Sequence, residues 1–169
     1  MRTDLYWIEG MWPGRLAIMP RPRGGDWLED EVRAWRDAGV DLVVSLLQDE
    51  EIADLILAEE EELCRTNGIE FLSFPIVDRG VPESREAVSL LVAKLAGRLS
   101  DGKNVAVHCR QGIGRAALIA ASTLVWLGID PELAMQRVGI ARQCSVPETP
   151  EQRRWVIEFS HTPLKPLLR

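Results

Sequence analysis

The sequence is poor in the residues on which several classes of protein depend. Its 169 residues include three cysteines, two histidines and one tyrosine. Cys64, Cys109 and Cys144 are odd in number and widely separated, which argues against a disulfide scaffold and favours a reducing, cytoplasmic compartment. No pair of Cys or His residues has the spacing of a structural zinc site, so we expect no metal and no other cofactor.

Net positive charge and long hydrophobic runs are lacking as well. The chain carries 20 Lys and Arg against 26 Asp and Glu, a net charge of −6, whereas nucleic-acid binding depends on a basic surface. The longest apolar stretch, residues 116–129, is too short to cross a bilayer. Residues 1–10 lack the apolar centre of a signal peptide. We therefore expect neither a nucleic-acid nor a membrane partner, and the oligomeric state stays open.

Short apolar runs alternate with helix patterns along the chain. Strands are predicted over residues 5–9, 16–19, 41–47, 69–74 and 104–107, and helices over 26–38, 50–66, 83–99, 116–128, 131–143 and 149–159. Strands joined through helices predict an α/β fold with a mainly parallel central sheet flanked by helices. The length suits one buried core, so we expect a single domain over 1–169, with its core at about 7–159 and a tail at 160–169.

Two local features of the predicted helices are also interpreted. Asp26 precedes an apolar periodic segment and is expected to cap the helix that follows. Residues 59–62 are four consecutive glutamates, which we expect to form the solvated side of a helix.

The most informative segment is residues 108–115, His-Cys-Arg-Gln-Gly-Ile-Gly-Arg, between a predicted strand and a predicted helix. Such a loop directs several backbone N–H groups toward an anion at the positive end of the helix dipole. The same field favours the thiolate of Cys109, which makes it nucleophilic. Arg115 supplies a planar fork for two phosphoryl oxygens. The phosphate-binding residues are predicted to be Arg110, Gln111, Gly112, Ile113, Gly114 and Arg115.

A His-Cys pair followed by five residues and an arginine resembles the signature of the cysteine-based protein tyrosine and dual-specificity phosphatases. A second feature of that superfamily lies upstream in residues 74–82, Phe-Pro-Ile-Val-Asp-Arg-Gly-Val-Pro, where Asp78 stands in the place of the general acid. The resemblance covers residues 7–159 approximately and is closest to the compact dual-specificity branch, which includes the kinase-associated phosphatases. It implies the phosphatase-type strand, phosphate loop and helix.

The resemblance also implies a reaction. Cys109 would attack the phosphorus and form a phosphocysteine, Arg115 would clamp the phosphoryl group, and Asp78 would protonate the leaving group. General acid catalysis is typically worth about 10²–10⁴-fold. Asp101 is the other candidate acid, although Asp-Gly before a strand is typical of a turn. His108 is a supporting candidate that either tunes the thiolate through hydrogen bonds or is a structural histidine at the end of a strand.

The substrates implied by the resemblance are phosphorylated proteins or small aryl phosphates. The chain is too short for the segment that deepens the pocket of large tyrosine-specific members, so phosphoserine and phosphothreonine would be accepted as well as phosphotyrosine. Lipid phosphatases of the superfamily tend to carry lysines inside the loop. Here the only additional loop cation is Arg110, which ranks protein substrates above phosphoinositides.

Two positions depart from the pattern of the family. Ala116 follows the loop arginine where serine or threonine is usual, and the missing hydroxyl predicts slow hydrolysis of the phosphocysteine. Glu148 stands where a water-positioning glutamine is often found, and Gln152 matches a later glutamine and is a weak supporting candidate. The local alternative is helix entry, with Thr149 as N-cap and Gln152 completing a capping box.

Other interpretations of the same residues stay open. Cys109 would alternatively be a small hydrophobic residue buried in the core. Asp78 would alternatively be a turn residue that hydrogen-bonds to its own backbone. As a whole, the chain would alternatively be a binding module that captures phosphorylated partners without turnover, or a rhodanese-like sulfurtransferase. The second alternative would need neither Arg115 nor a distant aspartate.

Overall fold

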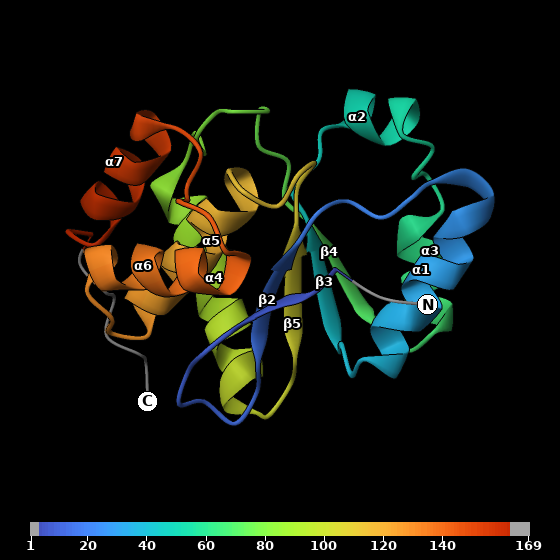
Figure 1. The fold of residues 1–169 in the computed structure, drawn as a ribbon, viewed down its shortest axis with the longest axis horizontal. Coiled ribbons are helices and arrows are strands. Elements are labelled where there is room, and N and C mark those ends of the chain that lie inside the picture. Colours follow the sequence, from blue (N-terminus) through green and yellow to red (C-terminus); the bar gives the residue numbers. More distant parts are fainter. Residues whose placement is uncertain (1–3, 163–169) are drawn as a thin grey trace.

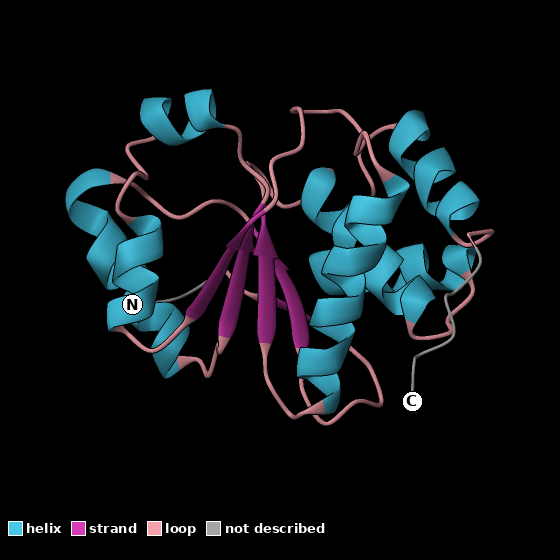
Figure 2. Ribbon diagram, turned by 180° about the vertical axis from the view of Figure 1, so that it is seen from behind, coloured by secondary structure: helices cyan, strands magenta, loops and turns pink. Residues whose placement is uncertain are grey.

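A five-stranded sheet forms the centre of the protein, and helices cover both of its faces (Figures 1 and 2). The structure, a computed structural model, describes residues 4–162, so most of the predicted tail at 160–169 lies outside the described residues. The strand order is β1-β2-β5-β3-β4, with β1 antiparallel and the other pairings parallel, which confirms the predicted mainly parallel sheet. The strands are β1 (Tyr6–Ile8), β2 (Leu16–Met19), β3 (Leu42–Ser45), β4 (Glu70–Ser73) and β5 (Val105–His108).

The helices divide between the two faces of the sheet. The 3₁₀ turn η1 with α1 and α3 lies on one side, α4 to α7 lie on the other, and α2 lies beyond the carboxyl ends of the parallel strands (Figure 1). No helix among residues 4–162 is long and apolar enough to cross a membrane. The elements are η1 (Gly25–Trp27), α1 (Leu28–Asp37), α2 (Asp49–Asp54), α3 (Glu60–Thr66), α4 (Arg85–Ser100), α5 (Arg115–Trp126), α6 (Pro131–Arg142) and α7 (Pro150–Phe159).

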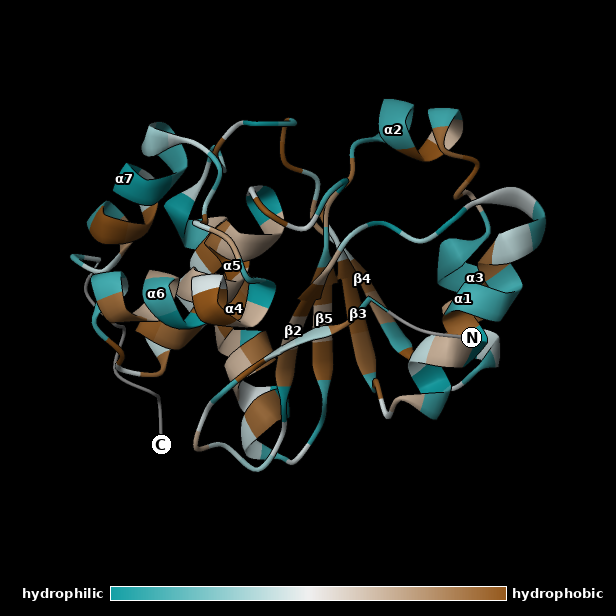
Figure 3. Ribbon diagram, viewed as in Figure 1, coloured by the Kyte–Doolittle hydropathy of each residue, from teal (hydrophilic) through white to brown (hydrophobic). Residues whose placement is uncertain are grey.

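Alternating side chains of the central strands build two separate cores, one on each side of the sheet. Figure 3 shows that the central strands are mostly hydrophobic. In β5, Val105 and Val107 pack toward α4 and α5, whereas Ala106 packs toward α1 and α3. Helix α5 is buried all round over its first ten residues, from Arg115 to Leu124. Such a helix has no solvent face, and it gives the loop that precedes it a rigid base.

The predicted helix over 50–66 is wrong in its continuity. The structure has two helices there, α2 and α3, separated by residues 55–59. Ile56 adopts a left-handed backbone with φ of 55°, which reverses the chain, and Leu57 then enters the core beside α1 and α3. Leu57 is buried by packing against distant parts of the chain. The helical periodicity of the sequence on either side of the break gives no sign of this packing, so the sequence predicts one continuous helix.

One local prediction about charged residues is wrong, and another fails at a single residue. Asp26 lies inside η1, and α1 begins at Leu28 without a side-chain cap. Within the run 59–62, three of the four glutamates are exposed as predicted, but Glu60 is buried, with only 2% of its surface exposed. Its carboxylate lies 2.5 Å from Nε2 of His108, the last residue of β5. Glu60 is therefore buried because it has a buried hydrogen-bond partner, His108, far along the chain.

Candidate active site

The loop between β5 and α5 has the predicted strand, loop and helix setting at the carboxyl edge of the sheet. Cys109 is 3% exposed, and its Sγ accepts hydrogen bonds from the backbone N–H groups of Gly112 (3.3 Å) and Ala116 (3.4 Å). Gly112 has a φ of +73°, and a Cβ there would lie 2.7 Å from the backbone carbonyl of Met19. The loop thus requires glycine at this position in order to fold back over the sulfur.

A small pocket of about 100 Å³ opens over this loop. A pocket of this volume accommodates one phosphoryl group. The pocket brings together the three predicted catalytic residues and all of the predicted phosphate-binding residues except Gly112, whose N–H donates to the sulfur instead. The pocket is lined by Asp78, Arg79, Cys109, Arg110, Gln111, Ile113, Gly114, Arg115 and Glu148.

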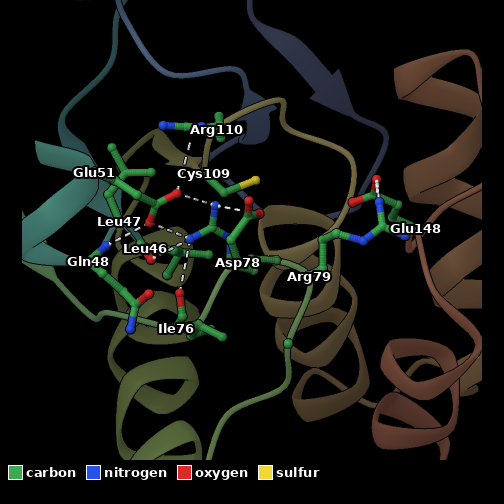
Figure 4. Close-up of polar contacts among 12 residues, drawn as sticks. Leu46, Leu47, Gln48, Glu51, Ile76, Asp78, Arg79, Cys109, Arg110 and Glu148 are labelled. Atoms are coloured by element: carbon green, nitrogen blue, oxygen red, sulfur yellow. Dashed lines mark hydrogen bonds and ion pairs between the residues drawn. The ribbon is translucent and has the colours of Figure 1, made fainter. Parts of the chain in front are cut away.

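Arg115 is 1% exposed, and its guanidinium is fixed by partners on α2, on the segment 74–82 and at the end of β3, where the Leu46 carbonyl accepts from Nη1 at 3.4 Å. Its Nη1 donates to Glu51 Oε2 (2.8 Å) and to the carbonyl of Ile76 (2.9 Å), and its Nη2 donates to Glu51 Oε1 (2.9 Å) and Asp78 Oδ1 (3.0 Å) (Figure 4). The two-point contact with Glu51 sets the plane of the fork. Because Asp78 accepts from the same group, the candidate acid and the candidate phosphate clamp lie side by side.

Glu51 is a site residue that the sequence did not reveal. It lies in the first turn of α2, where its Oε2 also accepts from the backbone N–H of Gln48 (2.9 Å) and completes a capping box. Glutamine is not a usual N-cap residue, so Glu51 at the third helical position is the only part of a capping box that the sequence shows. This signal does not, however, indicate that the carboxylate also binds an arginine 64 positions away.

Both groups of this pair stay ionised. Burial alone would raise the pKa of the Glu51 carboxyl, but the hydrogen bonds from Arg115 and the Gln48 backbone, together with the charge of Arg115, hold this pKa below its ordinary value of 4.5. Burial alone would lower the pKa of Arg115, but hydrogen bonding to Glu51 and the charge of a Cys109 thiolate raise it. Arg115 therefore keeps its charge although its side chain is buried.

Replacement of Glu51 by glutamine should destabilise the protein near neutral pH, by about 3 kcal/mol, because it removes the buried, two-point carboxylate partner of Arg115 and leaves only the half-exposed carboxylate of Asp78 to offset that charge. The stabilisation from Glu51 is complete above pH 4.5, the ordinary pKa of the group, and is lost as the pH falls through its lower folded-state pKa. Urea unfolding of the wild type and the variant, at pH 7 and below pH 4, measures the difference in their free energies of unfolding, which should be smaller in acid. Glu50→Gln, which changes an exposed residue of the same helix, is the control. An equal effect of the two substitutions would contradict the role of Glu51 as the buried partner of Arg115.

The segment that carries Asp78 is tied to the region before α7. The Asp78 side chain is 52% exposed, whereas its neighbour Arg79 forms an ion pair with Glu148 (2.8 Å). Gln152, fully buried, donates from Nε2 to the carbonyl of Gly80 (3.0 Å). These two contacts hold the candidate acid over the pocket from outside the phosphate loop.

The helix entry predicted at α7 is confirmed, since Thr149 and Gln152 form both hydrogen bonds of a capping box. Gln152 does not line the pocket, and its hydrogen bonds go to its own helix cap and to Gly80. Its amide also lies against Gly114 of the phosphate loop, where a Cβ would be 3.2 Å from Nε2. Glu148, at the position where a glutamine is often found, does line the pocket.

The remaining candidates lie elsewhere. His108 points to the opposite side of the sheet, toward Glu60. Asp101 is the C-cap of α4 and precedes the Gly102 turn, at the opposite end of β5 from the phosphate loop. Burial raises the pKa of the Cys64 thiol in the core beside α3, and Cys144 is exposed after α6. Neither of these two cysteines lines the pocket.

This α/β sheet with a cysteine loop between its central strand and a buried helix defines a protein of the cysteine-based phosphatase class. More narrowly, the chain belongs to the dual-specificity family, because residues 5–159 match the family model described as "Swiss Army Knife protein, DSP-PTPase phosphatase domain". The resemblance found in the sequence is thereby confirmed, and so is the fold class.

Individual relatives agree with this assignment. A crystal structure of kinase-associated phosphatase, with serine in place of its catalytic-site cysteine, superimposes with a TM-score of 0.85 at 19% identity, over 95% of this chain and 96% of that one. Tk-PTP in its active form gives a TM-score of 0.77 at 26% identity, over 96% and 100% of the two chains.

The curated relatives are longer than this chain. A putative tyrosine phosphatase, 197R, of Invertebrate iridescent virus 6 is 29% identical over 146 residues, which cover 83% of this chain and 52% of the viral protein. Cyclin-dependent kinase inhibitor 3 of Rattus norvegicus is 29% identical over 100 residues, 58% of this chain and 47% of the rat protein. The chain thus spans about half the length of the curated relatives it matches.

Proposed function

We propose that the protein hydrolyses phosphomonoesters through a phosphocysteine, with phosphotyrosine and also phosphoserine and phosphothreonine of proteins as substrates. The observation that carries the proposal is the convergence of Cys109, Arg115 and Asp78 on one pocket of phosphoryl size. A module that only binds phosphate needs the N–H groups of the phosphate loop and the arginine. A nucleophile and an acid are needed in addition only when the phosphate ester is cleaved.

In the first step, Cys109 Sγ attacks phosphorus from the floor of the pocket. The bond to the substrate oxygen breaks, and that oxygen takes a proton from Asp78. Phosphoryl oxygens replace Asp78 at Nη2 of Arg115, while Glu51 keeps the guanidinium in place. In the second step, water gives a proton back to Asp78 and attacks phosphorus, and the sulfur leaves as a thiolate held by the N–H groups of Gly112 and Ala116.

The surroundings of the pocket support phosphoprotein or aryl phosphate substrates. The side chains of Arg79 and Arg110 at the pocket are 65% and 41% exposed, and each has a carboxylate within ion-pair distance, Glu148 and Glu51 respectively. Their charges are partly offset, which suits a single phosphoryl group better than a substrate with several phosphates.

Rapid mixing with an aryl phosphate tests the proposal. We expect a burst of phenolate close to one equivalent per protein, followed by slower steady release, and acid quenching should leave phosphate on the peptide that contains Cys109. Steady turnover without a trapped phosphocysteine would contradict the covalent pathway. Tight binding of vanadate or a phosphopeptide with no release of phosphate would make the protein a phospho-binding module instead.

Replacement of Ala116 by serine should speed the second step by about tenfold, the effect of one added hydrogen bond to a developing thiolate. The backbone N–H of Ala116 already lies 3.4 Å from Cys109 Sγ, so a hydroxyl on the same residue is within reach of the sulfur. The steady rate after the phenolate burst reports this step. An unchanged steady rate in Ala116→Ser, with the burst intact, would show that the missing hydroxyl does not limit turnover.

A further inference from the structure

Behind the phosphate loop, on the α1 and α3 side of the sheet, lies a buried pair that the reaction described above does not use. Glu60 and His108 are 2% and 0% exposed, and Glu60 Oε1 lies 2.5 Å from His108 Nε2. The other ring nitrogen, Nδ1, lies 3.3 Å from the backbone carbonyl oxygen of Cys109. The imidazole therefore links a carboxylate on α3 to the residue that carries the candidate nucleophile.

The two contacts define where the hydrogens of the ring lie. A carbonyl oxygen only accepts, so the contact to Cys109 is a hydrogen bond when Nδ1 carries a hydrogen. Nε2 then either donates to an ionised Glu60 or accepts from a protonated one. In both cases one proton lies between Glu60 and Nε2, and the ring donates from Nδ1 to Cys109.

The position of this carbonyl matters because it belongs to the first peptide of the phosphate loop. In a planar trans peptide the C=O and N–H groups point in opposite directions. A Cys109 carbonyl held toward His108 thus turns the N–H of Arg110 to the opposite side, into the loop. The next carbonyl, that of Arg110, is held in turn by the backbone N–H of Arg21 (3.1 Å).

We propose that Glu60 is a positioning residue of the active site, which holds His108 with Nδ1–H on the Cys109 carbonyl and thereby fixes the start of the phosphate loop. A carboxylate in a protein core loses its hydration, which costs free energy unless a partner replaces the lost water. Among the described contacts of the Glu60 side chain, His108 is the one polar partner. Trp35 lies against the imidazole, and the buried thiol of Cys64 lies one turn along α3.

This inference rests on the proposed role of Cys109, so its first test uses no turnover. The chain has two histidines, His108 and His161, and ¹⁵N NMR of the imidazoles resolves them, with His161→Asn providing the assignment. We expect hydrogen on Nδ1 of His108 in the wild type. A neutral ring with hydrogen on Nε2 alone would overturn the proposal, because it has nothing to donate to Cys109.

The second test measures alkylation of Cys109 by iodoacetate, located by peptide mapping, with exposed Cys144 as the internal reference. Glu60→Met should slow alkylation of Cys109 about tenfold and leave Cys144 unchanged, as for the loss of one hydrogen bond. Glu60→Gln should restore most of the rate, because its amide donates to Nε2 and keeps the hydrogen on Nδ1. The matched control is Glu62→Met, which removes an exposed charge from the same helix.

A double-mutant cycle separates this role from a merely structural one. His108→Gln keeps a polar group near the Nε2 position for Glu60 but removes the donor to Cys109. In that background, Glu60→Met should have less than about a twofold further effect. An equal loss in both backgrounds, or an unchanged Cys109 rate in Glu60→Met with a lower melting temperature, would overturn the proposal. If Glu60→Met does not fold, Glu60→Gln and the NMR measurement decide.

Discussion

Replacement of Cys109 by serine should lower the turnover of an aryl phosphate by at least about 10⁴-fold, since a hydroxyl is not ionised at neutral pH and is a far weaker nucleophile. The change is close to isosteric. The N–H groups of Gly112 and Ala116 and the fork of Arg115 remain to bind the phosphoryl group. We therefore expect loss of the phenolate burst together with retained binding of vanadate or phosphopeptide, measured by rapid mixing and by calorimetry.

Two cysteines of the same chain provide matched controls. Cys144→Ser changes an exposed thiol outside the pocket, and Cys64→Ser changes a buried one in the core beside α3. The first should leave turnover unchanged, and the second should affect stability more than the chemistry. Turnover by Cys109→Ser above about one hundredth of the wild-type rate would exclude Cys109 as the essential nucleophile.

The phosphate loop could be predicted because its signals are local. A strand, a cysteine, two glycines and an arginine within one short segment determine both the backbone path and the chemistry, and the structure has this arrangement at residues 105–115. The parallel sheet followed equally from strands that alternate with helices. Asp78 needed the resemblance to a family, because nothing in its own segment indicates which pocket it reaches.

What could not be predicted is pairing over long separations. Glu51 lies 64 positions before Arg115, and Glu60 lies 48 positions before His108. In the sequence both glutamates belong to acidic segments, whose ordinary place is a solvated helix face. The turn between α2 and α3 places Glu51 on one side of the phosphate loop and Glu60 on the other. Leu57, which is buried, anchors this turn in the core.

The consequence is that two carboxylates hold the loop from two directions. Glu51 fixes the side chain at its end, Arg115, and Glu60 contacts His108 at its beginning. Neither glutamate needs to touch a substrate in order to affect the reaction. The α2 and α3 region is thus a support for the site rather than a mere connection between β3 and β4.

Replacement of Asp78 by asparagine should lower the turnover of a substrate with a poor leaving group by about 10²–10⁴-fold, the usual contribution of a general acid. Asparagine keeps an oxygen that accepts from Nη2 of Arg115, so the arginine should stay in place and the loss should report proton transfer. Asp101→Asn is the matched control, because that residue precedes a turn at the opposite end of β5.

The leaving group provides the decisive comparison. An aryl phosphate with a strongly acidic phenol needs no proton as it departs, so Asp78→Asn should affect it far less than the ester of a weakly acidic phenol or of serine. Steady-state rates and burst rates over a series of such esters measure this dependence. An equal loss for every ester would instead assign Asp78 to holding Arg115, the role that its 3.0 Å contact would then represent.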